Sequence, residues 1–263
     1  MPKFSANLTT MFTDTDFLNR FERAARAGFT AVEFMFPYDF EKQVIQKKLV
    51  KYQLEVVLHN FPAGNWTAGE RGIACLPNRV QEFQNSVGKA MEYSKALKCP
   101  RLNCMSGLTP ANTEAAITKQ TFVNNLRFAA SALEKEKIRL LIEPINYIDM
   151  PGYYLNFTQQ ALDIIKEVNH PNIRLQYDIY HAQVLEGNLT KTIREHMNLI
   201  EHMQLADVPG RHEPGTGEIN FTNLFRFIDE AGYNGWIGCE YKPAGKTEDG
   251  LEWIKPYLKK GGN

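Results

Sequence analysis

The feature that most limits how this chain can fold is a repeat in which a short apolar run leads into an amphipathic segment with helical spacing. Eight apolar runs occur, at residues 4–8, 31–36, 54–58, 101–104, 138–142, 173–177, 200–203 and 236–239. Strands that alternate with helices pair in parallel through right-handed crossovers, and eight such units close into a barrel without edge strands. We therefore predict the α/β class and a single (β/α)8 barrel, or TIM barrel, that spans residues 1–263.

The segments between these runs have the apolar spacing of helices that pack one face on a core. A clear example runs from Asp16 to Ala27, and Gly28 can end it in the left-handed conformation. Between the sixth and seventh strands we expect one helix, with an apolar face of Leu189, Ile193 and Met197. The last predicted helix carries Leu251, Trp253 and Ile254.

Two other architectures fit the length of the chain but not its pattern. A chain of 263 residues is long enough for two domains, yet no linker or low-complexity segment divides it. A doubly wound open sheet usually carries a glycine-rich phosphate loop after its first strand. Residues 9–13 (TTMFT) follow the first strand here and contain no glycine. The pattern therefore favours the barrel.

Charge and hydropathy restrict the partners that we expect. Lysine plus arginine and aspartate plus glutamate each total 30, so the formal net charge is zero and no basic face for nucleic acid is expected. No apolar run approaches the roughly 18 residues of a membrane span, and no secretory signal opens the chain. The four cysteines show no paired metal-ligand spacing. These features predict a cytoplasmic enzyme with reduced, buried thiols.

Four polar residues stand at the ends of four consecutive predicted strands: Glu143, Asp178, Gln204 and Glu240. The carboxyl ends of barrel strands meet on one face, and neighbouring strands are roughly 4.8 Å apart, so these side chains can converge. Three carboxylates and an amide oxygen suit a hard cation such as Mg2+ or Mn2+, which would also relieve the repulsion between the acids. The ordinary alternative for each acid is a helix N-cap or a solvated loop residue.

Other residues near the same predicted face suit a small anionic substrate. His181 can donate a hydrogen bond to a substrate oxygen, and Arg211 can pair with a carboxylate bidentately. Lys242 faces the same side as Glu240 if the last strand continues. The ordinary alternatives are a packing histidine, a surface salt bridge and a solvated lysine. The long stretch 60–78, which carries Trp66, Glu70 and Arg71, is typical of a lid over a barrel mouth.

Several stretches together resemble the hydroxypyruvate isomerase family, one of the xylose-isomerase-like barrels. They are 4–8 (FSANL), 32–34 (VEF), 68–72 (AGERG), 141–143 (LIE), 176–181 (QYDIYH), 211–219 (RHEPGTGEI) and 235–241 (GWIGCEY). The resemblance spans nearly the whole chain, and its last two stretches are quite specific. It implies interconversion of hydroxypyruvate and tartronate semialdehyde, with Glu143 and Glu240 as the proton-transferring pair.

The same resemblance implies a ring of metal ligands made of Glu143, Asp178, Gln204 and Glu240. We also expect His181, Arg211, Lys242 and Glu70 to contact the substrate. Related ketose epimerases have a histidine where this chain has Gln204, and a neutral amide in place of an imidazole weakens the expectation of metal dependence. Closely similar proteins isomerise 2-oxotetronate, so the resemblance leaves the substrate open among small sugar acids. A homodimer is compatible with the sequence but is not specified by it.

Four other functions remain as alternatives. A related ketose epimerase would share the two-glutamate chemistry. A metal-dependent endonuclease at DNA lesions would need several histidines at strand ends and a basic surface. A Schiff-base aldolase would need a lysine at the end of a middle strand, where Asp178 and Gln204 stand. A non-catalytic sugar-acid binding protein would not need both glutamates, and a catalytic assay separates it from an isomerase.

Overall fold

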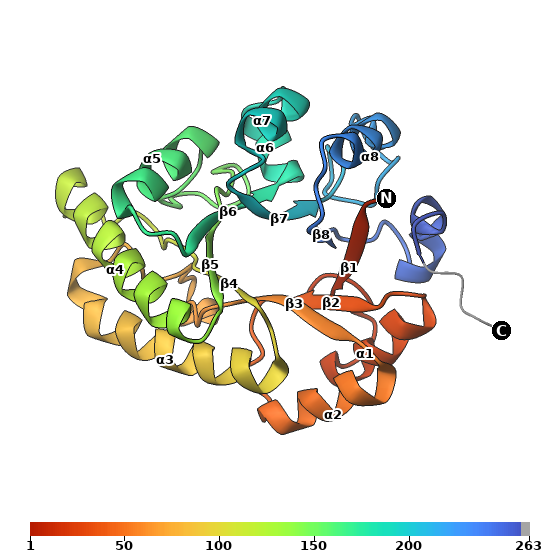
Figure 1. The fold of residues 1–263 in the computed structure, drawn as a ribbon, viewed down its shortest axis with the longest axis horizontal. Coiled ribbons are helices and arrows are strands. Elements are labelled where there is room, and N and C mark those ends of the chain that lie inside the picture. The colour runs from red at the N-terminus through yellow and green to blue at the C-terminus, as the bar shows by residue number, and fades with distance from the viewer. Residues whose placement is uncertain (259–263) are drawn as a thin grey trace.

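The structure, a computed structural model, describes residues 1–258 and contains a closed barrel of eight parallel strands in the order β1 to β8 (Figure 1). The strands are β1 Lys3–Asn7, β2 Ala31–Phe34, β3 Glu55–Asn60, β4 Arg101–Asn103, β5 Arg139–Ile142, β6 Ile173–Asp178, β7 Ile200–Leu205 and β8 Trp236–Cys239. β1 pairs with β8, with Phe4 opposite Ile237, which closes the ring. The predicted (β/α)8 barrel is confirmed.

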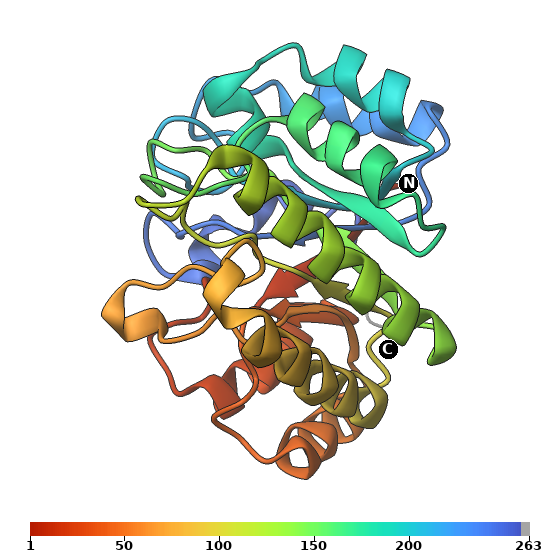
Figure 2. The same ribbon diagram turned by 90° about the vertical axis from the view of Figure 1, so that its left-hand side faces the viewer.

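The helices surround the strands and pack their apolar faces against them. They are α1 Phe17–Arg26, α2 Lys42–Tyr52, α3 Val80–Leu97, α4 Ala115–Lys135, α5 Thr158–Val168, α6 Ile179–Leu185, α7 Leu189–His196 and α8 Phe221–Glu230. In Figure 2 the long helices α3 and α4 lie side by side on the outside of the barrel. All four cysteines are buried and unpaired, as we expected of apolar fillers.

Two helix predictions need correction in detail. The helix predicted from Leu189, Ile193 and Met197 is present as α7, but a second helix, α6, was missed before it; Gly187 and Asn188, both with positive φ, separate the two. The predicted last helix is instead a pair of short 3₁₀ helices, η3 Thr247–Gly250 and η4 Glu252–Ile254. Pro256 follows closely, and a proline disfavours helical geometry in the residue before it.

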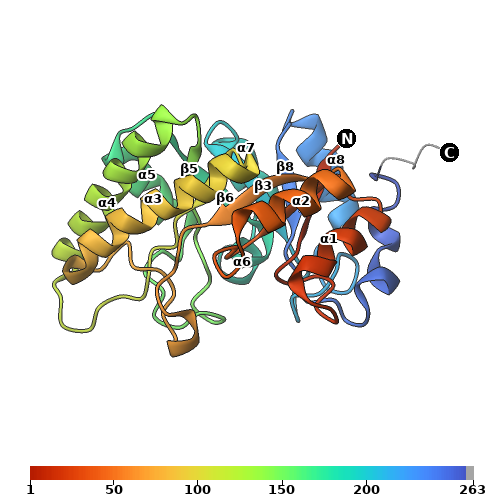
Figure 3. The same ribbon diagram turned by 90° about the horizontal axis from the view of Figure 1, so that it is seen from below.

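The loops that follow the strands gather at one face of the barrel. The loop between β3 and α3 is longer than the other loops that join a strand to the next helix, and it contains the 3₁₀ helices η1 Trp66–Ala68 and η2 Pro77–Arg79. In Figure 3 this loop extends away from the ring of helices. Within the described residues, no helix combines the length and the apolarity that a bilayer crossing needs.

Candidate active site

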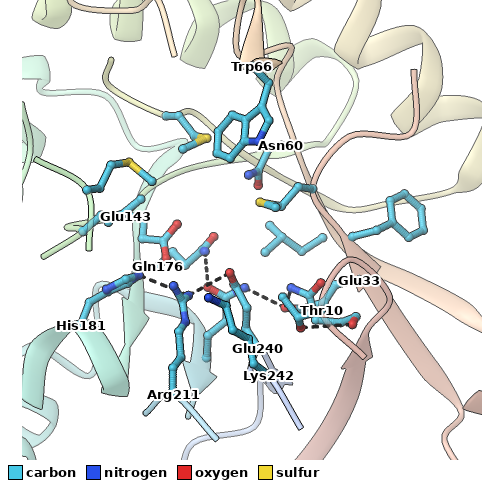
Figure 4. A pocket seen from close by; sticks show the side chains of 18 residues that line it. Thr10, Glu33, Asn60, Trp66, Glu143, Gln176, His181, Arg211, Glu240 and Lys242 are labelled. Atoms are coloured by element: carbon cyan, nitrogen blue, oxygen red, sulfur yellow. Dashed lines mark hydrogen bonds and ion pairs between the residues drawn. The ribbon is translucent and has the colours of Figure 1, made fainter. Parts of the chain in front are cut away.

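A cavity of about 180 Å³ lies at the carboxyl ends of the strands (Figure 4). Six residues that the sequence pointed to line it: Glu143, His181, Gln204, Arg211, Glu240 and Lys242. Others that line it were not predicted, among them Asn7, Thr10, Glu33, Asn60, Met105 and Gln176. The chain thus brings residues on β1, β2, β3, β6 and β7, and residues that follow β5 and β8, to one small space.

Glu143 follows β5 directly and is almost fully buried. The side-chain nitrogen of Asn103, at the end of the neighbouring strand β4, donates a 2.8 Å hydrogen bond to Glu143 Oε2. This contact fixes one carboxylate oxygen, so the carboxyl group cannot rotate freely in the cavity. Asn103 therefore positions Glu143.

Asp178 ends β6 and has two roles at once. Its Oδ1 accepts a 2.8 Å hydrogen bond from the backbone N–H of Tyr180, so it caps the N-terminus of α6. Its Oδ2 is buried and has no hydrogen-bond partner within residues 1–258. The ordinary N-cap role and the predicted site role are thus carried by different oxygens of one carboxylate.

The Arg211 guanidinium lies among these acids. Its Nη2 donates to Glu240 Oε1 at 3.0 Å and lies 3.7 Å from Asp178 Oδ2. In Figure 4 the guanidinium stands between His181 and Glu240. Asp178 itself is not in the cavity lining, so Arg211 supplies positive charge both to the cavity, which Glu143 and Glu240 line, and to Asp178 beside it.

The backbone around Arg211 explains why the side chain enters the cavity. Gly210 and Arg211 both have positive φ, 93° and 57°, which turns the loop after β7 sharply inward. The carboxylate of Asp207 accepts hydrogen bonds from backbone N–H groups at 208, 215, 217 and 219, which holds that loop. The backbone N–H of Lys242 donates to the Arg211 carbonyl at 2.8 Å. A non-glycine residue with positive φ is uncommon and is typical of functional loops.

The hydrogen bonds of His181 determine which ring nitrogen carries the hydrogen. Asn146 Oδ1 accepts from the backbone N–H of Asp149, so its Nδ2 is the group that faces His181 Nδ1 at 2.7 Å. Nδ1 is therefore an acceptor and Nε2 carries the hydrogen, so the 3.4 Å contact between Arg211 Nη2 and Nε2 joins two donors and is not a hydrogen bond. Burial lowers the pKa of His181 well below its ordinary value, and Arg211 adds to the effect. A neutral His181 with this tautomer presents a hydrogen-bond donor at Nε2.

Burial dominates the electrostatics of the three acids. It raises the pKa of the Glu143 carboxyl well above its ordinary value, and the charges of Glu240 and Asp178 raise it further. Burial also raises the pKa values of Asp178 and Glu240, and Arg211 opposes both shifts. Burial lowers the pKa of Arg211, but Glu240, Asp178 and Glu143 outweigh it and leave that pKa raised. Carboxyl groups tuned in this way can act as acid and base near neutral pH.

Gln204 belongs to a chain of hydrogen bonds that crosses the barrel. Its Nε2 donates to Glu33 Oε1 at 2.7 Å, and its Oε1 accepts from Gln176 Nε2 at 2.5 Å. Glu33 also accepts from Ser5 Oγ at 2.8 Å, Asn7 Nδ2 at 3.2 Å and His202 Nε2 at 2.8 Å. Four donors satisfy the buried carboxylate, and one lone pair of the Gln204 oxygen remains for another contact.

The donor set fits a divalent cation. Glu143, Asp178 and His181 each offer a ligand atom within 4.8 Å of the others, and Asp178 Oδ2 is a buried oxygen without a hydrogen-bond partner. Glu240 is not part of this group within residues 1–258, so the ring of Glu143, Asp178, Gln204 and Glu240 stays a prediction. An all-oxygen set suits a hard cation.

The other predicted site residues are placed differently. Lys242 lines the cavity and is exposed. Glu70 lies outside the cavity lining, because its carboxylate pairs with Arg79 and accepts the backbone N–H of Asn65. Trp66, in the same loop, does line the cavity, with the Arg71 guanidinium 4.2 Å from its ring centroid. Glu70 therefore holds the shape of the loop that brings Trp66 to the cavity.

Fold and site together define a barrel enzyme that binds a small molecule beside two glutamates, one buried and one partly buried, and comparison with known proteins agrees. The family model of the xylose isomerase-like TIM barrel matches residues 21–257. A hydroxypyruvate isomerase of Escherichia coli is 52% identical over 98% of this chain and 100% of its own. A 2-oxo-tetronate isomerase of Pectobacterium atrosepticum is 44% identical over 99% of both chains. The chain belongs to the hydroxypyruvate isomerase family of xylose isomerase-like barrels and is an isomerase.

Two solved structures are also similar. A crystal structure from Brucella melitensis, described as an AP endonuclease of family 2, is 47% identical and covers 98% of this chain and 100% of its own, with a TM-score of 0.96. A 3-keto-D-glucoside 4-epimerase of E. coli is 16% identical over 97% of this chain and 99% of its own, with a TM-score of 0.79. The second likeness concerns the fold alone.

Proposed function

We propose that this isomerase interconverts hydroxypyruvate and tartronate semialdehyde through an enediolate. The observation that carries the proposal is the pair of glutamates, buried Glu143 and partly buried Glu240, on one small cavity that also contains an arginine. The activity named for the E. coli relative, at 52% identity over its full length, supports the same reaction. A cavity of about 180 Å³ suits a short acid rather than a long sugar chain.

The reaction needs two proton transfers at neighbouring carbons. A carboxylate removes a proton from C3 of hydroxypyruvate, and a carboxylic acid delivers a proton to C2. The hydroxyl proton moves from the C3 oxygen to the C2 oxygen, so atoms and charge balance. Raised pKa values let Glu143 and Glu240 share these roles, one protonated and the other ionised, near neutral pH.

Two groups suit the substrate's oxygens. The Nε2–H of His181 faces the cavity and can donate to the oxygen that becomes negative in the enediolate. Arg211 and Lys242 border the same cavity and provide positive charge for the substrate carboxylate. This charge favours acids over neutral sugars.

Mg2+ or Mn2+ would be held by Glu143, Asp178, Gln204 and Glu240. When bound, such a cation supplies positive charge to the neighbouring oxygens of the enediolate. Asn103 and Glu33 hold Glu143 and Gln204 in place whether or not a cation is present.

The main alternative is isomerisation of 2-oxotetronate, which needs the same chemistry on an acid with one more carbon. Relatives named for that activity reach 45% identity, so the family alone does not separate the two substrates. A ketose epimerase is less favoured, because a neutral sugar leaves Arg211 and Lys242 without an anionic partner.

The name of the Brucella melitensis structure suggests a second candidate function, cleavage of DNA at lesions. The positions of the histidines in this chain argue against that function. His202 pairs with Glu33 inside the barrel, and His59 is buried against Phe34 with its Nδ1 near the Asn60 carbonyl. Among residues 1–258, only one histidine, His181, joins the candidate metal group. A histidine-rich metal cluster is therefore not formed there.

Proton NMR of hydroxypyruvate in D2O tests the proposal, with 2-oxotetronate and a chelated sample run in parallel. We expect conversion with deuterium at the exchanging carbon, and the faster acid identifies the preferred substrate. Loss of rate on chelation supports the cation site. Folded protein that neither converts nor exchanges either acid contradicts the proposal and favours a binding role.

A further inference from the structure

One guanidinium nitrogen of Arg211 contacts two of the four side chains proposed to hold a cation. Nη2 lies 3.0 Å from Glu240 Oε1 and 3.7 Å from Asp178 Oδ2. The second contact is too long for a hydrogen bond, so Asp178 Oδ2 is buried near positive charge without being satisfied by it. Arg211 therefore stands where the carboxylates converge.

A divalent cation on the same oxygens would sit close to this guanidinium. Metal–oxygen bonds to Mg2+ are about 2.1 Å, which is shorter than either contact of Arg211. Two positive centres that share ligands in a poorly hydrated cavity repel each other strongly. The present position of Arg211 therefore disfavours a cation on the same carboxylates electrostatically.

Arg211 has a second set of partners, Asp149 and Tyr180. Its Nη1 lies 4.0 Å from Asp149 Oδ2, and its guanidinium carbon lies 4.9 Å from the Tyr180 ring centroid. Asp149 itself is anchored by the Tyr180 hydroxyl at 2.8 Å. A small rotation of the arginine side chain toward Asp149 would keep it paired while it leaves Glu240.

We propose that the positively charged side chain of Arg211 competes with the divalent metal for Glu240 and Asp178. In the metal-free enzyme Arg211 neutralises these carboxylates. Metal binding displaces it toward Asp149, where the guanidinium is available for the substrate carboxylate. This last step rests on the proposed function, whereas the competition itself does not.

Titration of Mn2+, followed by electron paramagnetic resonance of the free ion, tests the competition. Arg211→Gln removes the charge, Arg211→Lys keeps it, and Lys242→Gln removes a charge from the cavity rim at a residue that forms no ion pair within residues 1–258. We expect Arg211→Gln to lower the Mn2+ Kd at least about tenfold. Arg211→Lys and Lys242→Gln should stay within about threefold of the wild type.

Three results would overturn the proposal: an Arg211→Gln Kd equal to or above the wild-type value, an equal gain in Lys242→Gln, or no Mn2+ binding by any of the proteins. Thermal melting of each metal-free variant shows that it is folded. Turnover of hydroxypyruvate by the same wild-type preparation is measured separately. An inactive wild type whose Arg211→Gln form binds Mn2+ more tightly would contradict the proposed function and leave the competition intact.

Discussion

The carboxylate of Glu33 accepts a 2.7 Å hydrogen bond from the side-chain amide of Gln204, inside the barrel and away from solvent. An ionised carboxylate only accepts, so the amide nitrogen must face Glu33. The amide oxygen then faces Gln176, whose Nε2 donates to it, and the cavity. A residue on β2 thus determines which atom Gln204 on β7 presents to the site.

Glu33→Gln should lower the free energy of unfolding by about 3 kcal/mol. The glutamine amide can accept from some of the four donors, but its own N–H groups must face at least one of them. Urea unfolding measures the loss, and Glu55→Gln, an exposed glutamate on the neighbouring strand, is the matched control. Equal stabilities of the two variants would show that the four hydrogen bonds to Glu33 are not needed.

Gly238→Ala should disturb the same network from the other side. A Cβ at Gly238 would lie 2.1 Å from Glu33 Oε1, so the carboxylate would have to move away from its donors. We expect a loss of about 2 kcal/mol or more, as for other overpacked cores, measured by thermal melting. Gly245→Ala, where a Cβ meets nothing within 4 Å, should change the melting temperature little. A Gly238→Ala variant as stable as Gly245→Ala would contradict this account.

The fold was largely predictable from the sequence, because each strand is visible as an apolar run. Strands that alternate with helices can be connected in only a few topologies. The helix predictions failed where a capping residue decides at which residue a helix begins or ends. Asp178 caps α6 with one oxygen, so a helix begins directly after β6, where the apolar spacing of residues 179–185 alone did not indicate one. Boundaries elsewhere moved by only a few residues, as in β2, which ends at Phe34.

The strand-end residues of the cavity were predictable because the carboxyl ends of barrel strands meet on one face. Residues that act from inside the barrel were not. Glu33 and Gln176 lie within strands, and the only sequence signal for Glu33 is a charge in an otherwise apolar run. Nothing in the sequence around Asn103 indicated that it contacts Glu143, apart from its place at the end of β4. Glu70 was misplaced because a loop sequence does not reveal that Arg79 holds it outside the cavity.

Glu143→Gln should change stability in a pH-dependent way in the metal-free protein. Burial and the neighbouring acids raise the folded-state pKa of Glu143, so its proton is bound more tightly in the folded chain than in the unfolded one. Wild-type stability relative to Glu143→Gln is therefore greatest below the unfolded pKa of about 4.3 and falls as pH rises. A tenfold difference in proton affinity is worth about 1.4 kcal/mol.

Urea unfolding of both proteins at acidic, neutral and mildly alkaline pH, with chelator present, measures this difference. Subtraction of the two curves cancels the contribution of titratable groups that do not interact with Glu143, whereas Glu240 and Asp178, whose charges act on Glu143, remain part of the difference. The exposed Glu230→Gln variant is the control and should show no comparable trend. A wild-type advantage that grows with pH would mean that the Glu143 carboxylate is stabilised, not destabilised, by its surroundings.

Glu240→Gln tests the two-glutamate chemistry most directly. The glutamine keeps the shape of the side chain, and its Oε1 can still accept from Arg211 Nη2, which lies 3.0 Å from the native Oε1. The variant removes proton transfer together with the negative charge that pairs with Arg211. General acid–base catalysis alone is worth about 10²–10⁴-fold, and Mn2+ binding by the variant, measured in parallel, shows whether a cation is still held. We expect kcat to fall at least about 100-fold in a protein whose melting curve is intact. Retention of more than about a tenth of the wild-type kcat would remove Glu240 from the proposed mechanism.

Deuterium uptake at C3 of hydroxypyruvate, corrected with an enzyme-free blank, then separates the two glutamates. A slow variant that still exchanges C3 assigns that step to Glu143, because the base remains although the acid is gone. Loss of exchange together with turnover assigns proton abstraction at C3 to Glu240.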